Sequence, residues 1–393
     1  MNDKRGANPL RNSAHPKEKV ALLLQGGGAL GAYQAGAYEA LDAAGHRPAW
    51  VAGISIGAIN AAIIAGNSPE NVVPRLREFW MRVSSSVTMF PMLEEMLETA
   101  FSQNAATTTL MFGAPGFFKP RSVPPFGSSP VAPADLSYYD TSELKATLEG
   151  LVEFERINEK VAGRTRLSIG AVELLSGNFS YFDNDKERIG AEHVMASGAL
   201  PPGLPPIEID GRYYWDGGLV SNTPLQYVID EDGRDDILAF QIDLFSARGP
   251  MPRNLFDVAE REKDIRFSSR TRLNTDVIKR RQSMAQAAMR LAKKVSAELR
   301  TDPDLAYLIE QASVPSMTLV HLIYKSKHDQ HSFSKDYEFS RASIETHWAA
   351  GKADVEATFA HPSWRNRLAP ARGEVKVLDL LDVPADISKS EVT

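Results

Sequence analysis

The sequence predicts an α/β fold built on a central, mostly parallel sheet. Strand and helix signals alternate from Lys19 to Gly66 and return from Arg164 to Phe245. Two short apolar runs in the first region are each followed by a glycine-rich turn and a helix-forming segment, which is typical of units in a parallel sheet. The 393 residues, of which 43% are hydrophobic, suffice for one large α/β domain and an extension.

The first unit begins with a strand expected over Val20–Leu24 and continues into a helix expected from Ala32 to Ala44. Between them lie Gly26, Gly27 and Gly28. Their backbone N–H groups have no side chains to shield them, as an oxyanion hole requires. We therefore expect these glycines to form an oxyanion loop.

The same glycines allow a different interpretation. Together with Gly31, Gly26 and Gly28 match the G-x-G-x-x-G pattern of a dinucleotide-binding loop. That pattern expects an acidic residue about 20 positions further on, at the end of the second strand. The second strand here ends in Gly53-Ile54-Ser55, so the nicotinamide-cofactor alternative lacks its ribose anchor.

The second unit places a serine between a strand expected over Ala49–Ala52 and a helix expected over Ala58–Ala65. This is the strand–turn–helix context of a G-x-S-x-G nucleophile elbow. A serine at the apex of such a turn has a strained backbone, and hydrogen atoms in place of side chains at Gly53 and Gly57 prevent clashes. The start of the helix directs unpaired N–H groups and partial positive charge toward Ser55, our candidate nucleophile.

A serine nucleophile needs a base. None of the histidines, at positions 15, 46, 193, 321, 328, 331, 347 and 361, lies in a glycine-framed turn, although a triad assembled in space stays open. Asp216 ends the aromatic strand Arg212–Trp215 and is followed by Gly217 and Gly218, which let another loop approach. We expect Asp216 to accept the Ser55 proton directly. The alternative is that Asp216 only caps a turn, as Asp-Gly often does.

Four blocks resemble the patatin-like phospholipases, a family of serine lipid acyl hydrolases with a Ser-Asp dyad. They are Gly26-Gly27-Gly28-Ala29-Leu30-Gly31, Gly53-Ile54-Ser55-Ile56-Gly57, Ala196-Ser197-Gly198-Ala199-Leu200-Pro201-Pro202 and Asp216-Gly217-Gly218. The resemblance covers roughly residues 18–245 and implies a three-layer hydrolase fold. It also implies that Ser55 is the nucleophile and acyl carrier, Asp216 the general base, and residues 26–28 the oxyanion donors.

Other positions qualify this resemblance. Ala29 stands where a basic residue is common in the family, so oxyanion binding would depend on backbone donors alone. Ser197 is a small residue near a helix end that Pro201-Pro202 stops, and we expect it to be architectural rather than catalytic. Asp264–Arg270 and Lys335–Ser340 resemble the C-terminal extension of a bacterial branch of the family.

These parts predict a hydrolase that deacylates lipid esters. Asp216 would remove the hydroxyl proton as Ser55 attacks the ester carbonyl, and the loop N–H groups would hold the oxyanion until an acyl-serine forms. We expect a pocket shielded by Tyr213–Trp215 to raise the proton affinity of the carboxylate. Two alternatives stay open: an intracellular polyester or thioester hydrolase with the same dyad, and a non-catalytic lipid-binding regulator. None of these requires a cofactor or a metal.

A segment at residues 84–135 interrupts the strand–helix alternation. It is too apolar for a plain linker, and its prolines and glycines are too frequent for one long element. Adaptable Met and Phe side chains suit varied apolar ligands, so we expect an inserted lid or an acyl-chain-binding element. The alternative is a helical hairpin packed on the core.

A second unusual segment, residues 261–300, is basic. It carries 12 Lys or Arg against 4 Asp or Glu in a chain of net charge −6. Apolar residues recur at helical spacing among these charges: Val277, Met284, Ala288, Leu291, Val295 and Leu299. A basic amphipathic helix can bind anionic lipid, whereas the plainer interpretation is a helix packed on its own domain. The acidic total and the lack of interleaved aromatic residues argue against a nucleic-acid partner.

The remaining features set the expected organisation. We expect a polar N-terminal tail at residues 1–17, a hydrolase domain at 18–245, and a helical or mixed C-terminal extension at 246–393. No apolar run resembles a signal peptide or a membrane span, and the chain has no cysteine, which together predict a cytoplasmic protein. Lipid substrates and the basic segment at 261–300 would bring it into peripheral contact with the inner membrane surface. The histidines at 321, 328 and 331 match no familiar metal-binding pattern, and a polar loop is the favoured interpretation there.

Overall fold

The computed structural model describes residues 18–84, 109, 113–122, 125–126, 130–231, 235–295, 302–312, 316–325, 335–370 and 374–380. Most of the expected 84–135 insertion, His328 and His331, and the residues after 380 lie outside these ranges. The description below concerns the described residues.

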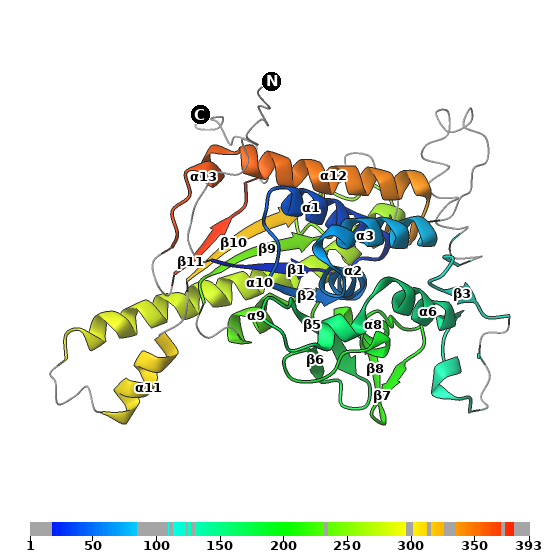
Figure 1. The fold of residues 1–393 in the computed structure, drawn as a ribbon, viewed down its shortest axis with the longest axis horizontal. Coiled ribbons are helices and arrows are strands. Elements are labelled where there is room, and N and C mark those ends of the chain that lie inside the picture. The colour runs from blue at the N-terminus through cyan, green and yellow to red at the C-terminus, as the bar shows by residue number, and fades with distance from the viewer. Residues whose placement is uncertain are drawn as a thin grey trace, which may run out of the picture.

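A mixed sheet runs through the molecule, and the described residues contribute nine strands to it (Figure 1). The strand order is β11-β10-β9-β1-β2-β5-β8-β7, with β6 also paired to β5. Neighbours from β11 through β5 are parallel, whereas β6, β7 and β8 pair in antiparallel fashion. The strands are β1 (Lys19–Leu24), β2 (Trp50–Ile54), β5 (Arg166–Glu173), β6 (Phe179–Asp183), β7 (Ile207–Ile209), β8 (Arg212–Asp216), β9 (Ile237–Asp243), β10 (Met317–Ile323) and β11 (Val375–Leu378). The predicted α/β class with a mostly parallel sheet is confirmed.

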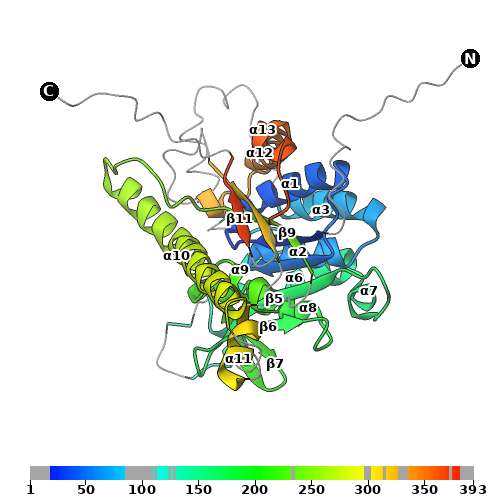
Figure 2. The ribbon, with the colours of Figure 1, turned by 90° about the vertical axis from the view of Figure 1, so that its left-hand side faces the viewer.

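Helices cover both faces of this sheet. The main ones are α1 (Gly31–Ala43), α2 (Ile56–Ala65), α3 (Pro69–Val83), α6 (Ser142–Leu151), α7 (Phe154–Asn158), α8 (Ala191–Ser197), α9 (Leu225–Glu231), α10 (Leu255–Ala292), α11 (Pro303–Ala312), α12 (Arg341–Ala360) and α13 (Pro362–Arg365). Short 3-10 turns are η2 (Gly28–Leu30), η3 (Pro133–Asp135), η4 (Gly217–Leu219) and η6 (Lys335–Tyr337), and a separate hairpin pairs β3 (Lys119–Pro120) with β4 (Tyr139–Asp140). The distal half of α10 and α11 project from the body (Figures 1 and 2).

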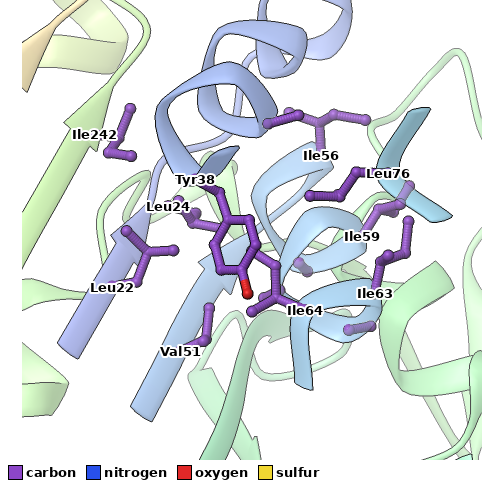
Figure 3. Close-up of a cluster of buried hydrophobic side chains, with 14 of the residues drawn as sticks. Leu22, Leu24, Tyr38, Val51, Ile56, Ile59, Ile63, Ile64, Leu76 and Ile242 are labelled. Atoms are coloured by element: carbon purple, nitrogen blue, oxygen red, sulfur yellow. The ribbon is translucent and has the colours of Figure 1, made fainter. Parts of the chain in front are cut away.

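The residue pattern of β1 explains the layering. Side chains alternate along a strand, so Leu22 and Leu24 face one side of the sheet while Ala21 and Leu23 face the other. The first side packs against α1, α2, α3 and α12, and Figure 3 shows part of this cluster. The second side packs against α9. A strand buried on both faces is expected to be a continuous apolar run, which is what the sequence has at Val20–Leu24.

The chain beyond Phe245 contributes to the same sheet and core. β10 pairs with β9, and β11 pairs with β10. Helix α12 lies on α1, where the Tyr33 hydroxyl donates to Asp354 over 2.7 Å and the Trp348 indole donates to Glu39 over 2.7 Å. The parts of the chain before and after Phe245 therefore share one hydrophobic core.

The two unusual segments are partly visible. Phe117 and Phe118, from the 84–135 segment, are buried and their rings pack against Phe339. The basic segment lies mostly in α10, as its helical periodicity predicts, with exposed Met284 and Leu291 on its distal half. None of the described helices is long and apolar enough to span a bilayer.

Candidate active site

Ser55 lies between the end of β2 and the start of α2, as predicted. Its backbone has φ 55° and ψ −125°, a combination that a side-chain-bearing residue rarely adopts. A Cβ atom at Gly53 would lie 2.3 Å from the carbonyl oxygen of Gly57, and one at Gly57 would lie 2.4 Å from that of Leu24. The turn is therefore as tight as the G-x-S-x-G pattern implies, and both glycines are sterically required.

Asp216 reaches Ser55 because of the sheet register. Ile54 pairs with Gly170 on β5, and Ala171 pairs with Asp216 on β8, so only strand β5 separates the strand that carries Asp216 from the strand that leads to Ser55. The Ser55 side chain lies close enough to the Asp216 carboxylate to lower its pKa. The carboxylate accepts a hydrogen bond from the Gly218 N–H over 2.7 Å. The two predicted dyad residues are thus neighbours in the structure.

The environment of Asp216 raises its proton affinity. The residue is 2% exposed, and burial raises its pKa from 3.8 to about 7, although the nearby Ser55 side chain and the hydrogen bond from the Gly218 N–H lower it. A carboxyl group with a pKa near neutrality is better suited to accept a hydroxyl proton than an ordinary aspartate. Of the three aromatic residues expected to shield Asp216, Tyr214, in the same strand β8, is buried beside Phe182, whereas Tyr213 and Trp215 are half-buried.

The glycine loop lies directly beside the serine. A Cβ atom at Gly26 would lie 2.9 Å from the Ser55 Cβ and 2.5 Å from the Asn222 Oδ1. Within the described part of the chain, no residue accepts a hydrogen bond from the N–H groups of Gly26, Gly27 or Gly28. These donors are therefore available to an oxyanion formed at Ser55.

Ser197 contacts the elbow, although its sequence context indicated only a helix end. Its Oγ accepts a hydrogen bond from the Ser55 N–H over 2.9 Å and donates to the Gly170 carbonyl over 2.6 Å. It is fully buried at the last turn of α8. Its hydroxyl therefore fixes the backbone of the candidate nucleophile, which is an architectural role.

Two amides that the sequence did not single out hold the glycine loop. The Asn222 side chain donates to the Gly26 carbonyl over 3.1 Å. The Gln25 Oε1 accepts hydrogen bonds from the N–H groups of Leu244 and Phe245, over 2.6 and 3.1 Å, and thereby ties the loop to the end of β9. Neither amide belongs to a spacing pattern that could be recognised from sequence alone. Their only signal was adjacency to the glycine motifs.

The described histidines lie away from the dyad. His193 accepts from the Gly190 N–H, His361 caps α13, and His321 pairs with Asp243. His46 packs among aromatic rings and His347 lies beside Tyr324. None of them hydrogen-bonds to Ser55, and the described residues include no cluster of three or more side chains that could bind a metal.

The arrangement of Ser55, Asp216 and the glycine loop coincides with the region recognised by a family model. A model described as "Patatin-like phospholipase" matches residues 22–229, more than half of the chain. The chain belongs to the patatin-like phospholipase family. This membership makes it an enzyme that hydrolyses lipid esters.

A second family model, described as "Patatin phospholipase", matches residues 265–371. The match includes Lys335–Ser340, one of the segments that resembled the C-terminal extension of a bacterial branch. None of the curated proteins matches the sequence significantly.

Several solved structures are distantly similar to this member of the family. VipD from Legionella pneumophila is 14% identical with a TM-score of 0.37, and the alignment covers 88% of this chain and 67% of VipD. Human GIVD cytosolic phospholipase A2 is 11% identical with a TM-score of 0.37, over 87% of this chain and 59% of the human protein. ExoU of Pseudomonas aeruginosa, solved with SpcU, is 14% identical with a TM-score of 0.29, over 75% of this chain and 68% of that chain. The family model, rather than any of these structures, supports the assignment.

Proposed function

We propose that this protein hydrolyses carboxylic ester bonds of lipids, including phospholipids, through an acyl-serine intermediate. Ser55 is the nucleophile, Asp216 is the general base, and the N–H groups of Gly26, Gly27 and Gly28 bind the oxyanion. The observation that carries the proposal is the position of a buried Asp216, with a pKa of about 7, next to Ser55 at the tight turn between β2 and α2. Family membership supports lipid esters as the substrate class.

The proposed reaction has two half-reactions of the same form. Asp216 takes the hydroxyl proton while the Ser55 oxygen bonds to the ester carbonyl carbon, and the loop N–H groups hold the resulting oxyanion. The carbonyl–oxygen bond to the alcohol then breaks, and Asp216 passes its proton to the leaving alcohol. Water, deprotonated by Asp216, attacks the acyl-serine, and the fatty acid leaves as the proton returns to Ser55.

The decisive experiment is covalent labelling with a fluorophosphonate, followed by intact-mass spectrometry. Wild type should gain one adduct, Ser55→Ala should gain none, and Asp216→Asn should react far more slowly while remaining folded by circular dichroism. The assay is run with and without detergent micelles. A folded wild type that gains no adduct in either condition would favour the non-catalytic lipid-binding regulator.

A substrate panel separates the ester classes. We expect phospholipids and neutral lipid esters to be cleaved faster than short polyester oligomers or acyl thioesters. The reverse order would favour the polyester or thioester hydrolase, which uses the same dyad with a different acyl pocket.

We also propose that the distal half of α10 contacts anionic membrane. Arg290, Lys293 and Lys294 are exposed there, and so are the apolar side chains of Met284 and Leu291. Apolar side chains enter the interfacial region, and each nearby cation contributes about 1 kcal/mol at an anionic surface. The cytoplasmic location, the lid at 84–135 and the division at residue 245 stay predictions.

Vesicle sedimentation tests this contact. The double change Lys293→Glu with Lys294→Glu should weaken binding to vesicles containing phosphatidylserine, whereas Lys145→Glu with Lys160→Glu, at exposed sites elsewhere, should not. Equal binding of wild type and both variants would contradict the proposal.

A further inference from the structure

The segment Lys335–Tyr337, which forms η6, lies directly on the glycine loop. Gly28 has φ 55°, and a Cβ atom there would lie 2.2 Å from the carbonyl oxygen of Asp336. The backbone of a residue more than 300 positions away therefore touches the third glycine of the oxyanion loop. Only glycine fits at this contact, because of both its backbone conformation and the space available.

Charged side chains fasten η6 to the first turns of α10. The Lys335 Nζ lies 2.8 Å from the Asp264 Oδ1 and 3.2 Å from the Glu260 Oε1. Lys263, the residue directly before Asp264, pairs with the Asp336 carboxylate. We call the contact of Lys335 with Asp264 and Glu260, and the contact of Lys263 with Asp336, the two clamps. In the first, η6 carries the positive charge, and in the second, α10 carries it.

These pairs are shielded from water. The side chains of Lys335 and Asp264 are 12% and 14% exposed. Burial lowers the pKa of Lys335, but Asp264 and Glu260 outweigh this effect, so its pKa lies above the ordinary value. Breaking such a pair leaves a charge in a poorly solvated place, which costs far more than breaking a surface pair.

The same stretch of α10 also reaches the other end of the glycine loop. The Gln25 Nε2 donates to the Phe267 carbonyl over 3.2 Å, and the Phe267 ring packs on Phe245 with centroids 5.1 Å apart. Helix α10 thus holds the loop through Gln25 on one side and through η6 on the other.

The neighbours of η6 place it at the candidate site itself. Phe339, which follows η6, is buried against Trp80, Phe117 and Phe118. Burial is the main cause of the raised pKa of Tyr337, and the charge of Asp216 contributes to it. Tyr337 therefore lies within electrostatic range of the dyad carboxylate.

We infer that Lys335 and Lys263 are positioning residues, which hold η6 against Gly28 and thereby keep the N–H groups of the glycine loop aimed at Ser55. A loop of three glycines has high conformational entropy, and donors that must be ordered during the reaction stabilise the oxyanion less than donors already in place. The C-terminal part of the chain is, on this inference, a working part of the active site. The catalytic consequence rests on the proposed function, whereas the loop contact does not.

The test compares Lys335→Gln with Lys335→Arg and with a matched control. The control is Arg266→Gln, because Arg266 forms an exposed pair with Glu262 on the outer face of the same helix, with exposed fractions of 66% and 55%. Hydrogen exchange is followed on peptides that contain residues 22–31. We expect exchange in Lys335→Gln to be at least tenfold faster than in wild type, and we expect Lys335→Arg and Arg266→Gln to resemble wild type.

Kinetics on a soluble nitrophenyl ester tests the consequence, with active sites titrated by fluorophosphonate so that unfolded molecules are not counted. We expect kcat per titrated site to fall 10- to 30-fold in Lys335→Gln, while KM changes less than threefold. In Lys335→Arg, kcat should return nearly to the wild-type value. An unchanged kcat per site with a smaller titrated fraction would show a role in folding only and would overturn the inference.

A second variant and the exchange data keep the test decisive. Lys263→Gln removes the other clamp and should change exchange and kcat in the same direction by a smaller factor, even if Lys335→Gln does not fold. If wild type neither labels nor hydrolyses esters, the proposed function fails, and the exchange rates still decide whether η6 holds the loop. Equal loop exchange in wild type, Lys335→Gln and Lys263→Gln would refute the clamp.

Discussion

The two glycine-rich turns of the candidate site are held in different ways. The elbow at Ser55 is bounded by β2 and α2, which are its immediate neighbours in sequence, and the hydroxyl of Ser197 adds one further contact. The loop at Gly26–Gly28 is held by residues from distant parts of the chain, including Asn222 and Asp336. A tight turn between a strand and a helix is fixed by its own covalent geometry, whereas a flexible glycine loop needs external supports.

This difference explains what each turn contributes. The elbow presents one atom, the Ser55 hydroxyl oxygen, and a strained backbone suffices to present it. In the proposed reaction the loop must aim several N–H groups at the oxyanion, at a point that no part of the protein occupies, so its supports must come from several directions. We therefore expect changes at the elbow to have large effects, and changes at single loop supports to have smaller ones.

The largest effect is expected at the base. Asp216→Asn keeps the shape of the side chain but removes its ability to accept the Ser55 proton, so we expect kcat to fall about 10³-fold. Ester turnover at saturating substrate measures this, with folding checked by circular dichroism. If the variant kept activity within threefold of wild type, Asp216 would not be the base, and the histidines would have to be reconsidered.

The second-largest effect is expected in the pH dependence of kcat/KM. This dependence should come from Asp216 alone and not from the glycine loop, because backbone N–H groups do not titrate in this range. With the pKa of Asp216 at about 7, kcat/KM should rise about 50-fold from pH 5 to pH 7 and level off above about pH 8. Asn222→Ala should lower the curve without moving its midpoint. A midpoint below pH 5 in wild type would contradict the assignment of Asp216 as the base.

The raised pKa of Asp216 also has a consequence for stability, with a definite sign. Folding favours the protonated form, so the stability that this group contributes is fully present below pH about 4 and is lost as pH rises through about 7. Asparagine cannot ionise, so Asp216→Asn should melt at a higher temperature than wild type at pH 8, and the difference should shrink toward pH 4. Calorimetry at the two pH values measures it, and a lower melting temperature at pH 8 would contradict the prediction.

Ser197→Ala tests the one added support of the elbow. It leaves the Ser55 N–H and the Gly170 carbonyl without their partner, and we expect a loss of about 2 kcal/mol, or about 30-fold in kcat, because the serine shifts. Ser197→Thr, which keeps the hydroxyl, is the matched control for turnover. Equal activity of the alanine variant and wild type would mean that the strained turn alone fixes Ser55.

Asn222→Ala is expected to have the smallest effect of this series. It leaves only the Gly26 carbonyl unpartnered, while Gln25 and η6 still hold the loop, so we expect about 1 kcal/mol, or about fivefold in kcat. Fluorophosphonate labelling rates of this variant and of Ser197→Ala give the ranking directly. If Asn222→Ala lost more activity than Ser197→Ala, the glycine loop would depend on its single support more strongly than the elbow does, contrary to our expectation.

The parts predicted from sequence are those whose cause is local. Strands β1 and β2, helices α1 and α2, and the turn at Ser55 follow from apolar runs and glycine positions within a few residues of each element. Asp216 was also recognised, because an aromatic strand and two glycines frame it. The same framing by glycines led us to expect that Asp216 accepts the Ser55 proton, and the family resemblance implied the same pairing.

The supports of the glycine loop were not predicted, for a physical reason. Gln25 and Asn222 act through contacts between residues that lie 196 to 242 positions apart, and Lys335 acts through residues more than 70 positions away. Such contacts depend on sheet order and helix placement, which periodicity does not determine. Lys335–Ser340 was noticed only as part of a C-terminal resemblance, and its position on the loop came from the structure.

The place of β9 in the sheet has a consequence for the newly synthesised chain. This strand pairs with β1 on one side and with β10 on the other, yet β10 begins more than 70 residues after β9 ends. At about 5–20 residues per second, a ribosome takes about 4–15 s to make that interval. During this time β9 is a long, apolar edge strand without its second neighbour, the kind of edge that invites pairing with another chain. Chaperone binding to nascent chains should accordingly be strongest after β9 has emerged from the ribosome and should decline once β10 has followed.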